Sequence, residues 1–202
     1  MARATSPRLR AINWEPMRFA EPQMESRIRR AVERLRGALH DDGWVVVGGL
    51  AVNAHGYQRF TDDVDILVPA DQAQAALGSL RAARFRIEGD ASGFAARDPD
   101  ARVRIDVLPT ENDGDRAAVE RGETADFGQG QEIRVAPVGA IASMKLRPPR
   151  QLRHRADVVE LMKLPRNRTA ALRFVQRFYP SQAAELARHV ARALRELRQR
   201  TR

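Results

Sequence analysis

The stretch from Trp44 to Val68 reads WVVVGGLAVNAHGYQRFTDDVDILV and contains the residues that decide the fold. It begins with an unbroken apolar run over residues 44–47, which is typical of a buried strand. The glycine pair Gly48-Gly49 ends that run, and residues 50–55 fit a short helix. Residues 63–68 then alternate in character and predict a second strand. The stretch therefore predicts a strand, a tight turn, a short helix and a returning strand.

The second strand carries two aspartates, Asp63 and Asp65, two positions apart. Because side chains alternate along a strand, both carboxylates face one side while Val64 and Ile66 face the core. Two carboxylates on one side repel each other unless a cation lies between them. Hard oxygen ligands of this kind favour Mg²⁺ or Mn²⁺. The alternative interpretation is that the pair belongs to an ordinary solvated strand face and binds no metal.

Residues outside this stretch predict further elements on both sides of it. Helices are expected at residues 24–40, 71–83 and 113–122, and strands at residues 85–88, 94–97, 103–107 and 132–135. Asp71 is expected to cap the second of these helices. After Pro137 the pattern is helical to the end of the chain.

The predicted fold class is therefore α+β, with a mixed β-sheet flanked by helices and followed by a helical C-terminal region. We expect an N-terminal arm at residues 1–23, a core at residues 24–136, and the helical region at residues 137–202. No apolar run is long enough to span a membrane, and the basic N-terminus lacks the apolar segment of a secretory signal. We therefore expect a cytoplasmic protein with no membrane partner.

Further candidate residues surround the aspartate pair. Gly48 and Gly49 let backbone N–H groups approach an anion at the start of a helix, or they form an ordinary tight turn. Asp106, on the polar face of the strand at 103–107, either completes a two-metal cluster or pairs with a neighbouring arginine, Arg102 or Arg104. Lys145 is one of only two lysines. It either neutralises a triphosphate or lies on the surface.

The stretch from Val46 to Val68 resembles the nucleotidyltransferase superfamily of the DNA polymerase beta type. The shared pattern is a hydrophobic strand, Gly-Gly, about a dozen residues, and Asp-hydrophobic-Asp-hydrophobic. The residues His55-Gly56, Arg59 and Thr61 resemble the branch that holds the abortive-infection-type (AbiEii-like) toxins. Two later segments are similar to the family's third-carboxylate strand and the helical segment after it: Arg104–Leu108, and Ile141–Leu146 followed by Asp157–Leu161.

This resemblance implies a nucleotidyltransferase fold and a metal-dependent transfer of a nucleoside monophosphate from an NTP to a hydroxyl, with release of pyrophosphate. Asp63, Asp65 and Asp106 are implied to bind Mg²⁺ or Mn²⁺ and, with Lys145, to be catalytic. The implied nucleotide-binding residues are Gly48, Gly49, Arg59, Thr61 and Lys145. The family's pattern often has an aspartate where this chain has His154, so the phosphate-binding arginine is left open among Arg150, Arg153 and Arg155.

Two of these positions also have structural interpretations. Arg59 is either a phosphate ligand or a loop residue paired with Asp62 or Asp63. His55, a single histidine beside a glycine turn, is interpreted as a packing or loop-anchoring residue. His40, His154 and His189 have no metal-ligand spacing.

Charge is unevenly distributed over the 202 residues, whose net charge is +9. Residues 1–40 contain nine Arg and four Glu, and residues 166–202 contain ten Arg and two Glu, whereas residues 41–165 contain more acids than bases. Basic ends around an acidic centre suit a polyanionic partner near bound metal, or they reflect an arginine-rich composition. With no cysteine, the chain has no thiolate nucleophile or zinc finger.

The last predicted helix has an apolar stripe, formed by Leu186, Val190, Leu194 and Leu197. Arg188, Arg192, Arg195 and Arg202 lie largely off that stripe, so the helix is amphipathic and basic. Its arginines are either solvated, or they contact an RNA backbone or an acidic antitoxin-like protein. We expect Ser181 to cap this helix.

Three functions remain open at this stage. The first is nucleotidyl transfer from NTP to RNA, especially the 3′ end of tRNA, as the toxin of a toxin–antitoxin or abortive-infection system. The second is transfer to a protein or to a small cationic molecule such as an aminoglycoside, which the acidic centre of the chain would suit. The third is a non-catalytic interaction module with the same fold.

Overall fold

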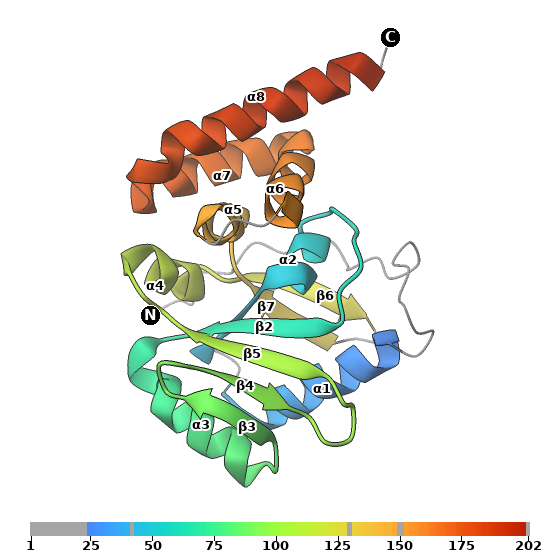
Figure 1. Ribbon diagram of the computed structural model, residues 1–202, viewed down its shortest axis with the longest axis vertical. Coiled ribbons are helices and arrows are strands. Elements are labelled where there is room, and N and C mark those ends of the chain that lie inside the picture. The colour runs from blue at the N-terminus through green and yellow to red at the C-terminus, as the bar shows by residue number, and fades with distance from the viewer. Residues whose placement is uncertain (1–23, 41–42, 129–130, 149–151, 201–202) are drawn as a thin grey trace, which may run out of the picture.

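The computed structural model describes residues 24–40, 43–128, 131–148 and 152–200. The expected arm at residues 1–23 lies outside these residues, as do Arg150 and Arg202. Seven strands form one mixed sheet in the order β3-β4-β5-β2-β1-β7-β6 (Figure 1). Their bounds are β1 Val45–Val47, β2 Asp63–Val68, β3 Arg86–Asp90, β4 Gly93–Arg97, β5 Arg104–Pro109, β6 Glu123–Gly128 and β7 Gln131–Val135.

The centre of the sheet brings the quoted stretch against a strand from farther along the chain. β1 pairs antiparallel with β2, while β2 pairs in parallel with β5 and β1 in parallel with β7. The pairs β3–β4, β4–β5 and β6–β7 are antiparallel. The three valines of β1 are fully or almost fully buried, as expected for a central strand with both faces covered.

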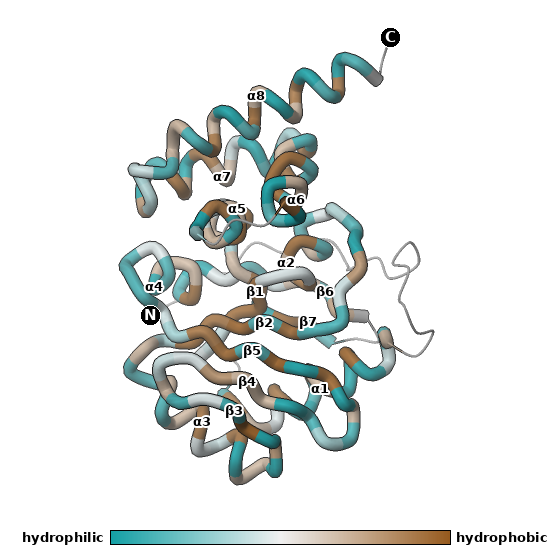
Figure 2. Tube along the Cα trace, viewed as in Figure 1, coloured by the Kyte–Doolittle hydropathy of each residue, from teal (hydrophilic) through white to brown (hydrophobic). Residues whose placement is uncertain are grey.

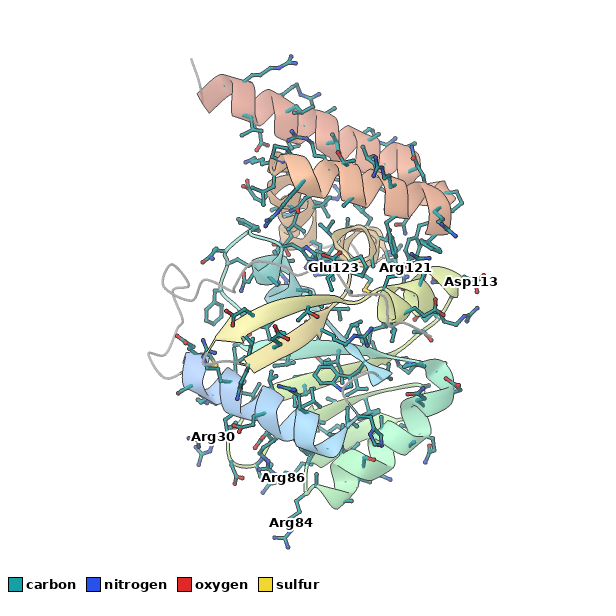
Figure 3. All side chains as sticks on the ribbon, turned by 180° about the vertical axis from the view of Figure 1, so that it is seen from behind. Arg30, Arg84, Arg86, Asp113, Arg121 and Glu123 are labelled. Carbon is teal, nitrogen blue, oxygen red and sulfur yellow. The ribbon has the colours of Figure 1, made fainter. Side chains whose placement is uncertain are left out.

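Helices lie on both faces of the sheet. α1 (Met24–Ala38) and α3 (Ala73–Ala82) lie on one face, which is in front in Figure 3 and behind in Figure 1. α1 is amphipathic and buries a stripe that includes Ile28, Val32 and Leu35. α2 (Gly48–Ala54) lies on the opposite face, over β1 and β2, and α4 (Asp113–Glu120) follows β5.

Every described element after β7 is helical. These are α5 (Val138–Leu146), α6 (Leu152–Lys163), α7 (Pro165–Phe178) and α8 (Ala183–Arg200), with short 3-10 turns at Pro180–Gln182 and, earlier in the chain, at Ala70–Gln72. α5 lies nearest the sheet and α8 lies outermost (Figure 1). Hydrophobic residues concentrate in the central strands and α5, while α8 is largely hydrophilic (Figure 2). The α+β class, the mixed sheet and the helical C-terminal region are confirmed.

A buried polar cluster joins the C-terminal helices to α4. Asp115, which is fully buried, accepts a hydrogen bond of 2.7 Å from the hydroxyl of Tyr179 at the end of α7. Arg147, the residue after α5, forms an ion pair with the same carboxylate. Because both partners bind the same carboxylate of α4, the cluster joins the ends of α5 and α7 to α4.

Three local expectations were wrong. No strand was expected at β6, where glycine and acidic residues lower the strand propensity, although Ala125 and Phe127 alternate and are both fully buried. Asp71 is not a helix cap, because it lies inside the 3-10 turn and Gln72 occupies the N-cap of α3. Ser181 likewise lies within a 3-10 turn before α8.

The buried side of α8 also differs from the expected stripe. Leu186 is fully buried, but Leu194 is 36% exposed, and Ala193 is buried in its place. The exposed arginines of α8 include Arg188, Arg192 and Arg195, as expected. No helix in the described part of the chain is long and apolar enough to cross a membrane.

Candidate active site

Three carboxylates meet where β2 and β5 run side by side. Asp63 and Asp65 project from β2, and Asp65 is paired in register with Asp106 on β5. One carboxylate oxygen of each residue lies within 4.8 Å of the others. All three residues are half-buried, and they are the only such group of potential metal ligands among the described residues. The expected convergence of these carboxylates is confirmed in geometry, and metal binding by them stays a prediction.

The residues fit a divalent cation chemically. Three hard oxygen donors lie close together, and their mutual repulsion needs compensation. Burial, together with the charges of Asp63 and Asp106, raises the pKa of Asp65 to about 6. Lys145 and a hydrogen bond from the backbone N–H of Gly49 oppose this rise. The ionised cluster is therefore held under electrostatic stress, which a bound cation would relieve.

The two glycines at the start of α2 leave room for Asp65 and Thr61. A Cβ on Gly48 would lie 1.7 Å from Oδ2 of Asp65, and Gly48 has a φ of +62°. A Cβ on Gly49 would lie 2.4 Å from Oγ1 of Thr61. Both positions therefore require glycine because of close approach, and at Gly48 also because of the left-handed backbone.

Thr61 is buried beside the carboxylates and does not face solvent. Its hydroxyl donates a hydrogen bond of 3.0 Å to Oδ1 of Asp63. This contact fixes the Asp63 side chain, so in this structure Thr61 positions a carboxylate. Its expected contact with a nucleotide stays a prediction.

The carboxylates form one side of a cleft of about 450 Å³. The opposite wall comes from α5, α6 and the loop before β2, and it is largely basic. The lining residues with a positive or titratable nitrogen are Arg59, Lys145, Arg153 and His154. Ile141 and Met144 add apolar surface from α5. The cleft thus places acidic groups opposite basic ones, as needed to hold metal-bound phosphates.

Lys145 is buried, with 7% of its surface exposed, so the interpretation of it as a surface lysine was wrong. Its Nζ lies 2.7 Å from Oδ2 of Asp157 on α6, and Nε of Arg59 lies 3.2 Å from Oδ1 of the same carboxylate. Burial lowers the pKa of Lys145, and the adjacent Asp157 opposes that shift. Asp157 therefore holds two cations of the cleft wall together.

Sequence reasoning did not assign a role to Asp157 or Asn53. The only sequence signal for Asp157 was its place in the segment Asp157–Leu161, which resembles the family. Asn53 accepts a hydrogen bond of 2.8 Å from the Arg59 backbone N–H and donates one of 3.0 Å to the Arg59 carbonyl. It thereby anchors the loop that carries Arg59. Arg59 pairs with Asp157 and not with Asp62 or Asp63, the partners considered for it as a loop residue.

Asp106 lies close to the other two carboxylates and also to one of the arginines considered for it, and metal binding by it stays a prediction. It belongs to the carboxylate group, and its Oδ1 also accepts a hydrogen bond of 2.8 Å from Nε of Arg104. Arg104 lies 3.8 Å from a carboxylate oxygen of Glu88 on β3 as well. Asp106 therefore lies both in the carboxylate group and in an ion pair with Arg104.

His55, which follows α2, is almost wholly buried. Its Nε2 is 2.8 Å from the carbonyl oxygen of Ala136, and its own carbonyl accepts a hydrogen bond from Asn167. Burial lowers the pKa of His55 to about 4. The histidine is therefore neutral and joins α2 to the end of β7 and to α7, which confirms its interpretation as an anchor.

The three arginines considered as phosphate ligands differ in their position relative to the cleft. Arg153 lines the cleft, whereas Arg155 is exposed and is not among the lining residues. Arg150 lies outside the described residues. His154, at the position where the family often has an aspartate, also lines the cleft.

No protein-family model and no curated protein matches this sequence. Among solved structures, the chain is similar to the solution structure of the antibiotic-resistance factor ANT(2'')-Ia, with 16% identity and a TM-score of 0.47 over 88% of this chain and 94% of that chain. It is also similar to a crystal structure of ANT(2'')-Ia in complex with adenylyl-2''-tobramycin. That match has 13% identity and a TM-score of 0.44 over 83% of this chain and 97% of that chain.

Proposed function

We propose that this protein is a metal-dependent nucleotidyltransferase that moves a nucleoside monophosphate from an NTP to an acceptor hydroxyl. The observation that carries the proposal is the convergence of Asp63, Asp65 and Asp106 in a cleft whose opposite wall holds Lys145 and Arg59. A carboxylate group that binds divalent cations, facing fixed cations, is the arrangement needed to position and neutralise a triphosphate.

Each residue has a distinct part in the proposed reaction. Asp63 and Asp65 would hold both metal ions and Asp106 one of them, and the bound Mg²⁺ or Mn²⁺ would neutralise the triphosphate and acidify the acceptor hydroxyl. Lys145, Arg59 and Arg153 contribute positive charge to the phosphate side of the cleft. Gly48 and Gly49 allow the triphosphate to approach the backbone closely.

The proposed chemistry is an in-line displacement. The acceptor oxygen forms a bond to the α-phosphorus as the bond between that phosphorus and the bridging oxygen breaks, and pyrophosphate leaves. Asp106 is the candidate to accept the hydroxyl proton.

For the acceptor we propose RNA, with the 3′ end of tRNA as the first substrate to test. The support is the positive charge of the chain and its many exposed arginines. On this proposal the protein acts as a toxin and an antitoxin protein is its partner. Induced expression that arrests growth only when the carboxylates are intact would support the toxin role, and normal growth would contradict it.

The direct test uses purified protein, an α-labelled NTP, Mg²⁺ or Mn²⁺, and total tRNA, with each of the four NTPs in turn. We expect label in the RNA and loss of that label with Asp65→Asn, which removes a ligand charge. Asp71→Asn is the control, because it removes an exposed carboxylate outside the cleft. Labelling that survives Asp65→Asn would contradict the mechanism. Labelling of a protein or of an aminoglycoside instead of RNA would keep the mechanism and change the acceptor.

A further inference from the structure

Three arginines form a row across the sheet beside the carboxylates. Asp63 on β2 is paired in register with Arg104 on β5, Arg104 with Arg97 on β4, and Arg97 with Arg86 on β3. Residues paired across neighbouring strands project from the same face of a sheet. We call Arg86, Arg97 and Arg104 the basic row. It begins next to Asp63 and runs to the edge of the sheet.

The basic row lies on the part of this sheet face, over β3, β4 and β5, that no described helix covers. The alternate residues of these strands, Ala96 and Ile105, are fully buried on the face covered by α1 and α3. All three arginines of the row are exposed. In Figure 1 no described helix lies in front of β3, β4 and β5. A molecule that follows this face toward β2 therefore reaches Asp106 before it reaches the basic wall of the cleft.

With cations bound to the three aspartates, the charges of this face favour an anion. Within the described residues, Arg86 and Arg97 form no ion pair, whereas Arg104 pairs with Asp106 and Glu88. Glu88 and Asp90 are the carboxylates that β3 places on the same face, beyond the row, and Glu88 is in register with Asp106 through Ala95 of β4. Cations bound by Asp63, Asp65 and Asp106 would remove the remaining negative charge at the inner end. A polycationic acceptor such as an aminoglycoside would be repelled by the row.

We propose that the basic row binds backbone phosphates of the RNA acceptor and directs its terminal hydroxyl past Asp106 to the metal site. The inference rests on the proposed function and adds the surface and the direction of approach. Two strand spacings separate Arg104 from Arg86, so the row spans about 10 Å. That span allows contacts to more than one phosphate, and the guanidinium fork matches a phosphate's oxygens.

This surface differs from the basic helix α8, which the sequence alone suggested for RNA. α8 lies in the outermost layer of the C-terminal helices, away from the strands that carry the carboxylates (Figure 1). Part of its charge is already used, because Arg192 pairs with Glu196 at 2.9 Å. The basic row, in contrast, is continuous in register with Asp63.

The test measures the affinity of a fluorescent single-stranded RNA oligonucleotide by anisotropy, without NTP, over a series of salt concentrations. The double variant Arg86→Gln/Arg97→Gln should bind at least about ten-fold more weakly at low salt. Its slope of log affinity against log salt should be shallower by about 0.7 for each lost phosphate contact. The matched control Arg188→Gln/Arg195→Gln removes the same charge from α8 and should leave both quantities close to wild type.

Equal losses in the two double variants would show that net charge alone governs binding and would overturn the proposal. Unchanged binding by Arg86→Gln/Arg97→Gln would overturn it as well. Tobramycin provides a third arm, since label transfer to it that increases in the Arg86→Gln/Arg97→Gln variant would identify a cationic acceptor and contradict the proposal.

Binding of a non-hydrolysable NTP with Mn²⁺ is measured separately on the same proteins. We expect it to be unchanged in both double variants, because the cleft residues are intact. Loss of RNA binding with normal NTP binding supports the basic row. Wild-type protein that binds no NTP would contradict the proposed function, and the RNA measurement would still decide whether the row binds phosphates.

Discussion

Asp157 lies 2.7 Å from Lys145, and both side chains are almost completely buried beside the cleft. Because the same carboxylate also pairs with Arg59, it fixes two cations that face the three carboxylates. Removing one member of a buried ion pair leaves the other charge uncompensated, and this is usually strongly destabilising. Asp157 is therefore a positioning residue for the basic side of the cleft.

Asp157→Asn should lower the free energy of unfolding by about 3 kcal/mol, because Lys145 and Arg59 lose their common counter-charge. In protein that remains folded, the KM for NTP should rise, because the two cations are no longer held in place. Denaturant unfolding and initial rates measure these effects. Glu160→Gln, on the same helix, is the control, since Glu160 pairs with Lys163 outside the cleft lining. Equal effects of the two variants would contradict the special position of Asp157.

Asp65→Asn should separate two effects of the carboxylate cluster: the repulsion that destabilises the metal-free protein, and the binding of a cation. In metal-free protein at neutral pH the variant should be more stable than wild type by about 1–3 kcal/mol, because a repelling charge is removed from a half-buried site. The amide oxygen can still accept the Gly49 N–H. Thermal unfolding with and without Mn²⁺ measures both effects. Wild type should be stabilised by Mn²⁺ and the variant should not, since a ligand that binds only the folded state raises its stability. A variant stabilised by Mn²⁺ as strongly as wild type would rule out Asp65 as a ligand.

Gly48→Ala should damage the site more than the fold. The new methyl group would lie 1.7 Å from Oδ2 of Asp65, so the carboxylate must move. The left-handed backbone adds a cost of about 1–2 kcal/mol for a residue with a Cβ. We expect loss of the Mn²⁺ response and of nucleotidyl transfer. Gly78→Ala is the matched control, because nothing lies within 4 Å of its added Cβ and it should stabilise α3. If Gly48→Ala retains full activity, the close approach is not required.

Much of the site was readable from local patterns. Strand alternation placed Asp63 and Asp65 on one face, and the polar face of a later strand supplied Asp106. The local pattern did not predict the order of the strands in the sheet. Only the parallel pairing of β2 with β5 brings Asp106 beside Asp65, and that pairing joins segments about forty residues apart. Strand periodicity showed which way each carboxylate faces, and the family resemblance added the expectation that the two strands meet.

Other features depend on tertiary contacts that leave little trace in one sequence. Asp157 is an ordinary acidic residue of a helix until α6 packs beside α5 and meets Lys145. The basic row was invisible for the same reason, since Arg86, Arg97 and Arg104 lie on three strands and align only through their register. β6 was missed because burial by neighbouring elements outweighs its poor strand propensity.

His55→Gln should remove a defined part of the acid sensitivity of this protein. The pKa of His55 is about 4 in the folded state, below its ordinary value of 6.5, mainly because of burial. Between pH 6.5 and 4 the unfolded chain therefore binds a proton that the folded protein does not, so the free energy of unfolding falls as the pH decreases across this range. The full shift corresponds to about 3 kcal/mol. Above pH 6.5 the residue is neutral in both states and contributes no pH dependence.

Glutamine retains an N–H that can donate to the Ala136 carbonyl, and it does not titrate. The unfolding free energy of His55→Gln should therefore fall less steeply than that of wild type as the pH is lowered from 6.5 to 4. Glu123 acts in the opposite direction, because burial raises its pKa to about 7 and its contribution to stability is lost as the pH rises through that value. The difference between the wild-type and His55→Gln curves removes this term, since Glu123 is present in both. Urea unfolding at a series of pH values gives the two curves, and parallel curves over pH 4–6.5 would show that His55 is protonated as readily in the folded protein as in the unfolded chain.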